Sequence, residues 1–165
     1  MKKSNLKNLC LAGIFTALIY VVTAYLHIPS HVGYTHVGDG LIYLAASLLP
    51  MPYAICAASI GALLADCLTG FAIWAPASVI IKAVTVLFFS SKKEKIITKR
   101  NLTALLPSAL LCFLGYYVYE SLLISNFTAA LSGLMGYIMQ SLLSSVLYVL
   151  LGFSLDKAGI KTKLR

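Results

Sequence analysis

Long apolar segments separated by short polar ones dominate this chain of 165 residues. They lie near 6–26, 40–70, 75–90, 102–124 and 129–154. The first of them is already long enough to cross a bilayer as a helix. Only 11% of the residues are charged, against roughly a quarter in soluble domains. So few charges cannot cover a water-facing surface, and the sequence therefore predicts an all-α integral membrane protein.

The second apolar segment decides how many helices to expect. Residues 40–70 exceed the roughly 20 that one membrane-spanning helix needs, and Pro50 and Pro52 interrupt them. We therefore expect two helices there, and a compact bundle of six transmembrane helices in one domain covering residues 1–165. The predicted helices lie near 6–26, 39–50, 52–70, 75–90, 102–124 and 129–154, with a basic loop at 90–101.

Basic residues cluster at the N-terminus, in the 90–101 loop and in the C-terminal tail, and only Lys82 lies inside an apolar segment. Six crossings put all three clusters on one side of the membrane, whereas five would strand the middle cluster. Because positive clusters beside membrane helices stay in the cytoplasm, both termini are predicted to be cytoplasmic. The clusters form no continuous basic face, so we expect contact with lipid headgroups and not with nucleic acid.

Two charged side chains are predicted at similar depth in the membrane. Asp66 lies near the outer end of the third helix, and Lys82 lies about two turns into the fourth. Ionisable groups there are costly unless they are paired or functional. We expect a structural Asp66–Lys82 ion pair, the alternative being that one of them meets a charged ligand.

Polar and aromatic residues mark the outer parts of the last two helices. Tyr116 and Glu120 share a helix face, and a polar line runs along the sixth helix, formed by Tyr137, Gln140, Ser144 and Tyr148. Such a line faces protein or a cavity and not lipid. These residues either form an interfacial aromatic belt or line a pocket that opens outward, and we favour the pocket as a substrate-binding site.

The 27–38 loop contains all three histidines of the chain. A metal site would require the loop to fold around the ion without a supporting cysteine set. A lid over the outer cavity is the more economical interpretation, so neither a metal nor a cofactor is expected. His36 in this loop, Asp39 at the start of the second helix and Trp74 in the next outer loop complete the candidate substrate-binding residues.

Small residues recur on the first helix, where Ala12 and Thr16 interleave with Gly13 and Ala17. This spacing lets another helix approach closely. The partner is either a helix of the same bundle or a separate membrane subunit.

These features together resemble the substrate-binding S components of energy-coupling factor (ECF) vitamin transporters over nearly the whole chain. The most specific matching residues, in order, are Gly38, Asp39, Gly61, Asp66, Gly70, Pro76 and Lys82. The later segment GYYVYESLLISN, followed by Gly136 and Gln140, is similar to members that take up thiamine precursors or pyridoxine-like compounds.

The resemblance implies a high-affinity vitamin-binding subunit in the bacterial cell membrane. Such a subunit docks through its first helix, here through Ala12, Gly13, Thr16 and Ala17, on a transmembrane coupling subunit that carries two cytoplasmic ATPases. The soluble segments of this chain are too short to hold an ATPase, so we expect no enzymatic activity and expect ATP hydrolysis in the partner subunits.

Two other functions stay open at this point. One is a small intramembrane enzyme that uses His31 or His36 with Asp39 as acid and base, although neither G-x-S-x-G nor H-E-x-x-H occurs. The other is a channel or self-sufficient secondary transporter, which the lack of repeated halves disfavours.

Overall fold

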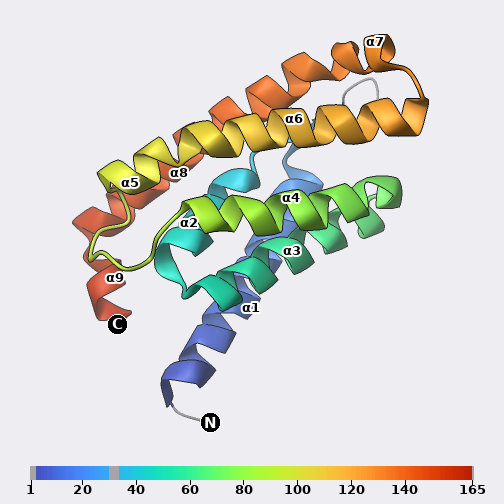
Figure 1. The fold of residues 1–165 in the computed structure, drawn as a ribbon. Helices are drawn as coiled ribbons and strands as arrows, with labels where there is room; N and C mark the ends of the chain where they lie inside the picture. The colour runs from blue at the N-terminus through green and yellow to red at the C-terminus, as the bar shows by residue number, and fades with distance from the viewer. Residues whose placement is uncertain (1–2, 30–33, 165) are drawn as a thin grey trace.

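A computed structural model of the chain describes residues 3–29 and 34–164. Figure 1 shows α6 and α8 side by side in one layer, α1, α3 and α4 in a second, and α2 between them. The elements are α1 (Lys3–Tyr25), β1 (His27–Pro29), β2 (Tyr34–His36), α2 (Asp39–Leu48), α3 (Met51–Leu68), η1 (Ala72–Trp74), α4 (Ala75–Phe88), α5 (Lys99–Thr103), α6 (Leu105–Ile124), α7 (Phe127–Ala130), η2 (Leu131–Gly133), α8 (Leu134–Lys157) and α9 (Ile160–Lys163).

Each predicted membrane helix has a counterpart among α1, α2, α3, α4, α6 and α8, and the predicted break at Pro50 separates α2 from α3. Within residues 3–29 and 34–164, four helical segments are long and apolar enough to cross a membrane: Ser4–Tyr25, Met51–Leu68, Lys99–Ile124 and Phe127–Lys157. Two shorter apolar helices cover Asp39–Leu48 and Ala72–Phe88. The chain is therefore an all-α, multi-pass membrane protein.

The outer surface of α6 and α8 consists of large apolar side chains. The exposed ones include Leu106, Leu110, Leu114, Met135, Leu142 and Val146. In water such an apolar surface would promote aggregation, whereas in a bilayer it contacts the lipid tails. This outward face leaves the polar residues of both helices to the interior.

Helix α2 is shorter than the helix predicted over 39–50. It has ten residues, which corresponds to a rise of about 15 Å, half the thickness of a hydrocarbon core of about 30 Å. All residues from Asp39 to Ser47 are buried. The first residue of α2 therefore lies inside the bundle and not at its rim.

The chain enters the bundle ahead of α2 through a very close approach to α1. A Cβ atom on Gly38 would lie only 2.0 Å from the Thr23 hydroxyl oxygen, so a larger residue would force the segment away from α1. Part of the predicted lid forms a two-stranded antiparallel hairpin in which His27 pairs with His36. Residues 30–33 of that lid, including His31, lie outside the described residues.

The two ends of the chain and the 90–98 loop meet at one end of the bundle. The Lys7 ammonium donates to the Leu164 carbonyl, and the Lys161 ammonium donates to the Lys95 carbonyl at 3.2 Å. The Asp156 carboxylate accepts the backbone N–H groups of Ile96 and Ile97, at 2.7 and 2.9 Å. Described residues of all three basic clusters therefore meet at one end of the bundle.

A buried polar network holds this end together around Asn101, which is fully buried. Its amide nitrogen lies 3.0 Å from the Ser90 carbonyl, 2.9 Å from the Ile96 carbonyl and 3.2 Å from the Ser47 hydroxyl. Its amide oxygen accepts the Ser90 N–H at 2.9 Å. The Tyr148 hydroxyl contacts Ser47 at 3.0 Å and donates to the Ile96 carbonyl at 3.1 Å. One side chain thereby ties α2 and the 90–98 loop to α5.

We predict that Asn101→Ala lowers the free energy of unfolding by about 3 kcal/mol, because it leaves several buried donors and acceptors without partners. Thermal unfolding in detergent measures the loss. Asn5→Ala, at an exposed position of α1, is the matched control and should change nothing. Equal melting temperatures for the two variants would contradict the structural role of Asn101.

Candidate functional site

An ion pair inside the bundle joins α2 to α4. The Lys82 ammonium lies 2.8 Å from one oxygen of Asp39 and 2.9 Å from the other, and each side chain is 3% exposed. The predicted partner of Lys82 was Asp66, and the structure corrects this to Asp39. The reason is the short α2, which starts at the depth of Lys82 and delivers its first carboxylate there. Asp66 is buried near the end of α3, where its backbone carbonyl accepts the Phe71 N–H at 2.9 Å.

Helices α6 and α8 also contribute to this carboxylate. The Gln140 amide nitrogen donates to Asp39 at 2.9 Å, and the Cys112 sulfur lies 4.0 Å from the same oxygen. Next to it, the buried His36 accepts the Gly38 N–H through Nδ1 at 3.2 Å. Four helices therefore surround one buried anion, which distributes its charge over several donors.

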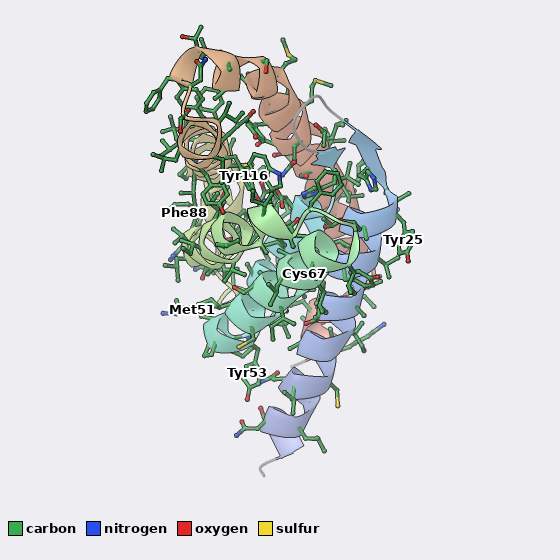
Figure 2. The ribbon with its side chains drawn as sticks, turned by 90° about the vertical axis from the view of Figure 1, so that its right-hand side faces the viewer. Tyr25, Met51, Tyr53, Cys67, Phe88 and Tyr116 are labelled. Atoms are coloured by element: carbon green, nitrogen blue, oxygen red, sulfur yellow. The ribbon has the colours of Figure 1, made fainter. Side chains whose placement is uncertain are left out.

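An aromatic cluster lies beside the ion pair. Tyr116 and Tyr137 stack with their ring centroids 5.4 Å apart and their planes at 15°. Trp74 meets Tyr116 edge-on at 6.1 Å, and the Lys82 ammonium lies 4.9 Å from the Tyr116 centroid. The Tyr116 hydroxyl is bonded to Ser78 at 2.9 Å. Figure 2 shows Tyr116 in the interior of the bundle, whereas the 71% exposed Tyr25 projects from its outside.

Glu120 is fully buried one helical turn beyond Tyr116. The Tyr137 hydroxyl donates to its Oε2 atom at 2.6 Å. Its Oε1 atom forms no hydrogen bond with the described residues. A Cβ atom on Gly133 would lie 2.6 Å from Oε2, so the carboxylate packs directly against the backbone at residue 133.

The structure thus brings together most of the predicted substrate-binding residues. His36, Asp39 and Gln140 surround the ion pair, and Trp74, Tyr116, Tyr137 and Glu120 form the cluster beside it. Ser144 lies apart at the contact between α2 and α8, where its carbonyl would be 2.6 Å from a Cβ atom on Gly40. The hydroxyl of Ser144 is buried and forms no hydrogen bond with the described residues.

Three residues of the cluster were not among the predicted site residues. Cys112 precedes Tyr116 and Glu120 on one face of α6 at four-residue steps. Ser78 stands four residues before Lys82 on α4. Four-residue helical spacing from Tyr116 and Lys82 predicts Cys112 and Ser78 at the site. Gly133 matters only through its contact with Glu120, which the sequence does not reveal.

Among the described residues, no three His, Cys, Asp or Glu side chains are grouped as metal ligands would be.

The predicted docking residues of α1 divide between two surfaces. Ala12 is buried in the core cluster that includes Ala54 and Ala57 of α3, and the Thr16 hydroxyl donates to the Ala12 carbonyl at 2.9 Å. Gly13 and Ala17 are exposed, and a Cβ atom on Gly13 would meet nothing within 4 Å. Of these four residues, Gly13 and Ala17 therefore present a small-residue surface to the outside.

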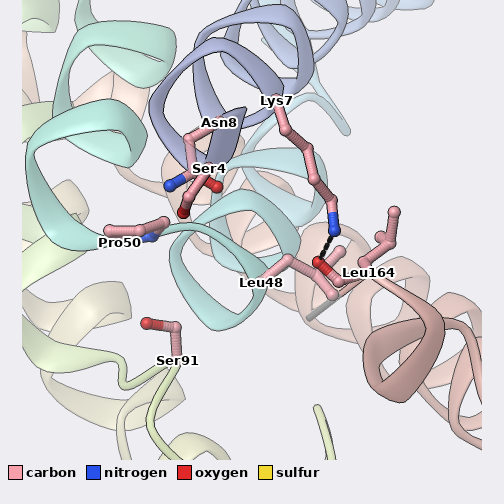
Figure 3. A pocket seen from close by; sticks show the side chains of 7 residues that line it. All are labelled: Ser4, Lys7, Asn8, Leu48, Pro50, Ser91 and Leu164. Carbon is pink, nitrogen blue, oxygen red and sulfur yellow. Dashed lines mark hydrogen bonds between the residues drawn. The ribbon is translucent and has the colours of Figure 1, made fainter. Parts of the chain in front are cut away.

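A separate polar cavity of about 450 Å³ lies at the basic end of the bundle, away from the ion pair. Figure 3 shows its lining, which comes from the first turns of α1, the turn between α2 and α3, the segment after α4 and the end of the chain. The lining residues are Ser4, Lys7, Asn8, Leu48, Pro50, Ser91 and Leu164. The hydrogen bond between Lys7 and Leu164 forms one wall.

The family model for the S component of ECF-type riboflavin transporters matches residues 3–157. The match spans all six main helices and every residue of the ion pair and the aromatic cluster. None of the curated proteins compared with the chain matches it.

We predict that Lys82→Met lowers the free energy of unfolding by about 3–5 kcal/mol, because it leaves the Asp39 carboxylate buried without its cation. The double variant Asp39→Asn with Lys82→Met should recover much of that loss, since no charge then remains. Unfolding in detergent measures both. A double variant less stable than Lys82→Met alone would contradict the pairing.

Proposed function

The chain belongs to the family of S components of ECF-type riboflavin transporters, and from this premise we propose that it binds a flat heteroaromatic vitamin at the Tyr116–Glu120 cluster. As an S component it is the substrate-binding membrane subunit of a vitamin transporter and not an enzyme. The ligand enters from the end of the bundle opposite the basic clusters. Riboflavin is the first candidate, because the family carries its name.

The observation that carries this proposal is the buried carboxyl group of Glu120, which has a hydrogen-bond donor on only one oxygen and lies beside the ring of Tyr116. An acceptor that is buried without a donor costs free energy, and Glu120 Oε1 is such an acceptor among the described residues. A ligand that donates an N–H or O–H group to it removes this cost. The Tyr116 ring offers a stacking surface for the same ligand.

The finer choice of ligand rests on shared chemistry. The resemblance of the segment at residues 115–126 points to thiamine precursors or pyridoxine-like compounds, and the family model names riboflavin. All three are flat nitrogen-containing rings with hydroxyl groups, so each offers a stacking face and hydrogen-bond donors. Gln140 and the Asp39–Lys82 pair beneath the cluster supply further polar partners for ring nitrogens and carbonyls.

We further propose that energy comes from a transmembrane coupling subunit with two cytoplasmic ATPases. The described segments outside the main helices are short and contain no fold that could bind a nucleotide. The exposed Gly13 and Ala17 of α1 offer the coupling subunit a close helix contact. The basic end of the bundle faces the cytoplasm of a bacterial cell, with both termini there and six crossings overall.

The two rival functions fit the site less well. Asp39 accepts from Lys82 and Gln140, and a carboxylate held by two donors is a poor general base. Retention of one ligand per chain without turnover separates a binding subunit from an enzyme. Uptake into vesicles by this chain alone would favour the secondary transporter.

We predict that Glu120→Gln weakens binding about tenfold, because the amide keeps one oxygen acceptor but loses the second. Titration of the purified protein with riboflavin, pyridoxine and the thiamine precursor hydroxymethylpyrimidine measures the dissociation constant of each compound. Glu94→Gln, in the exposed basic loop, is the control. Unchanged affinity in Glu120→Gln would reject the assigned role of this carboxylate.

We predict that Gly13→Trp abolishes assembly with the coupling subunit and leaves ligand binding unchanged, since the added ring projects outward and meets nothing in the bundle. Co-purification with the coupling subunit and the ATPases measures assembly. Leu18→Trp, at an exposed position of the same helix, controls for the bulk of the ring. Normal assembly of Gly13→Trp would remove this face of α1 from the interface.

A further inference from the structure

We propose that Tyr137 is a built-in stand-in for the ligand, and that the ligand binds by displacing it from Tyr116 and Glu120. This inference rests on the proposed function and names the residue that controls entry to the site. It assigns Tyr137 a different role from Tyr116 and Gln140, which remain in place as the walls of the site.

The phenol of Tyr137 makes both contacts that the ligand is expected to make. Its ring stacks on Tyr116 at 5.4 Å with nearly parallel planes. Its hydroxyl donates to Glu120 at 2.6 Å. A flat ring with a hydrogen-bond donor is the chemistry of a hydroxylated heteroaromatic vitamin, and one such group already occupies the stacking surface and the acceptor.

The stand-in satisfies the site only in part. Glu120 is fully buried, yet Tyr137 supplies a donor to Oε2 alone, and Oε1 has no hydrogen bond with the described residues. A ligand with two donors can therefore bind Glu120 better than a phenol can. This difference in satisfied acceptors provides a driving force for exchange.

Tyr137 is also the member of the cluster that is freest to move. Tyr116 is 6% exposed and its hydroxyl is bonded to Ser78, and Trp74 is 7% exposed. Tyr137 is only partly buried, and the single hydrogen bond of its side chain in the described structure is the one to Glu120. Rotation of this one side chain breaks that bond, whereas displacing Tyr116 would break the ring contact to Trp74 and the bond to Ser78.

The test is Tyr137→Phe, which keeps the ring and removes only the donor to Glu120. The state in which residue 137 stacks on Tyr116 then loses its hydrogen bond to Glu120. The state in which residue 137 has left the site is therefore more populated, and the apparent affinity for the ligand rises. We expect the dissociation constant to fall about tenfold. The gain should lie in the association rate, because in the bound state Tyr137 has already left the site.

Trp74 provides the signal, since it is the single tryptophan of the chain and lies edge-on to Tyr116. Stopped-flow fluorescence with riboflavin, pyridoxine and hydroxymethylpyrimidine gives the rates and the dissociation constant. Tyr119→Phe is the matched control: Tyr119 also contacts Trp74, at 5.8 Å, but its hydroxyl donates to the Ile73 carbonyl. It should leave both quantities unchanged.

A coupled measurement separates displacement from a merely structural effect. If Tyr137 acts by occupying Glu120, the gain from Tyr137→Phe shrinks when it is made in the Glu120→Gln protein. Weaker or equal binding by Tyr137→Phe, with wild-type protein that does bind, would overturn the stand-in and leave the proposed function intact. Wild-type protein that binds none of the three compounds would overturn both.

Discussion

The Asp39–Lys82 ion pair is the interaction around which the bundle is arranged. A carboxylate and an ammonium that are each 3% exposed cannot rely on water, so the protein must surround them with its own polar groups. Gln140 of α8 and Cys112 of α6 contact the same carboxylate oxygen. The layer formed by α6 and α8 is thereby attached to α2 and α4, and the aromatic cluster lies where the two layers meet.

The two ends of the bundle differ in how completely their buried polar groups are hydrogen-bonded. At the basic end, Asn101 and Tyr148 fill the acceptors of the 90–98 loop, and Asp156 takes two of its N–H groups. At the other end, Glu120 keeps one buried oxygen without a hydrogen bond to the described residues. A fully hydrogen-bonded network makes the basic end rigid. The unpaired acceptor at the other end can accept a hydrogen bond from a ligand. This contrast is consistent with the proposed binding of a ligand at the end opposite the basic clusters.

Sequence patterns located the main helices because apolar length and proline breaks act locally. They also grouped Tyr116 with Glu120 and Tyr137 with Gln140, because spacings of three and four residues fix a helix face. They paired Lys82 with the wrong acid, because that choice depends on the depth at which α2 begins. This depth is set by the approach of Gly38 to Thr23 and by the β-hairpin, which are contacts between distant segments. The clearance that Gly133 gives to Glu120 is invisible in the sequence for the same reason.

The most direct test of the account is native mass spectrometry of the intact protein, purified in mild detergent and saturated in turn with riboflavin, pyridoxine and hydroxymethylpyrimidine. The account predicts that one of these compounds is retained at one molecule per chain and is released with its mass unchanged. A folded chain that retains none of them, or one that releases a chemically altered product, would contradict the conclusion that this site binds a vitamin for transport.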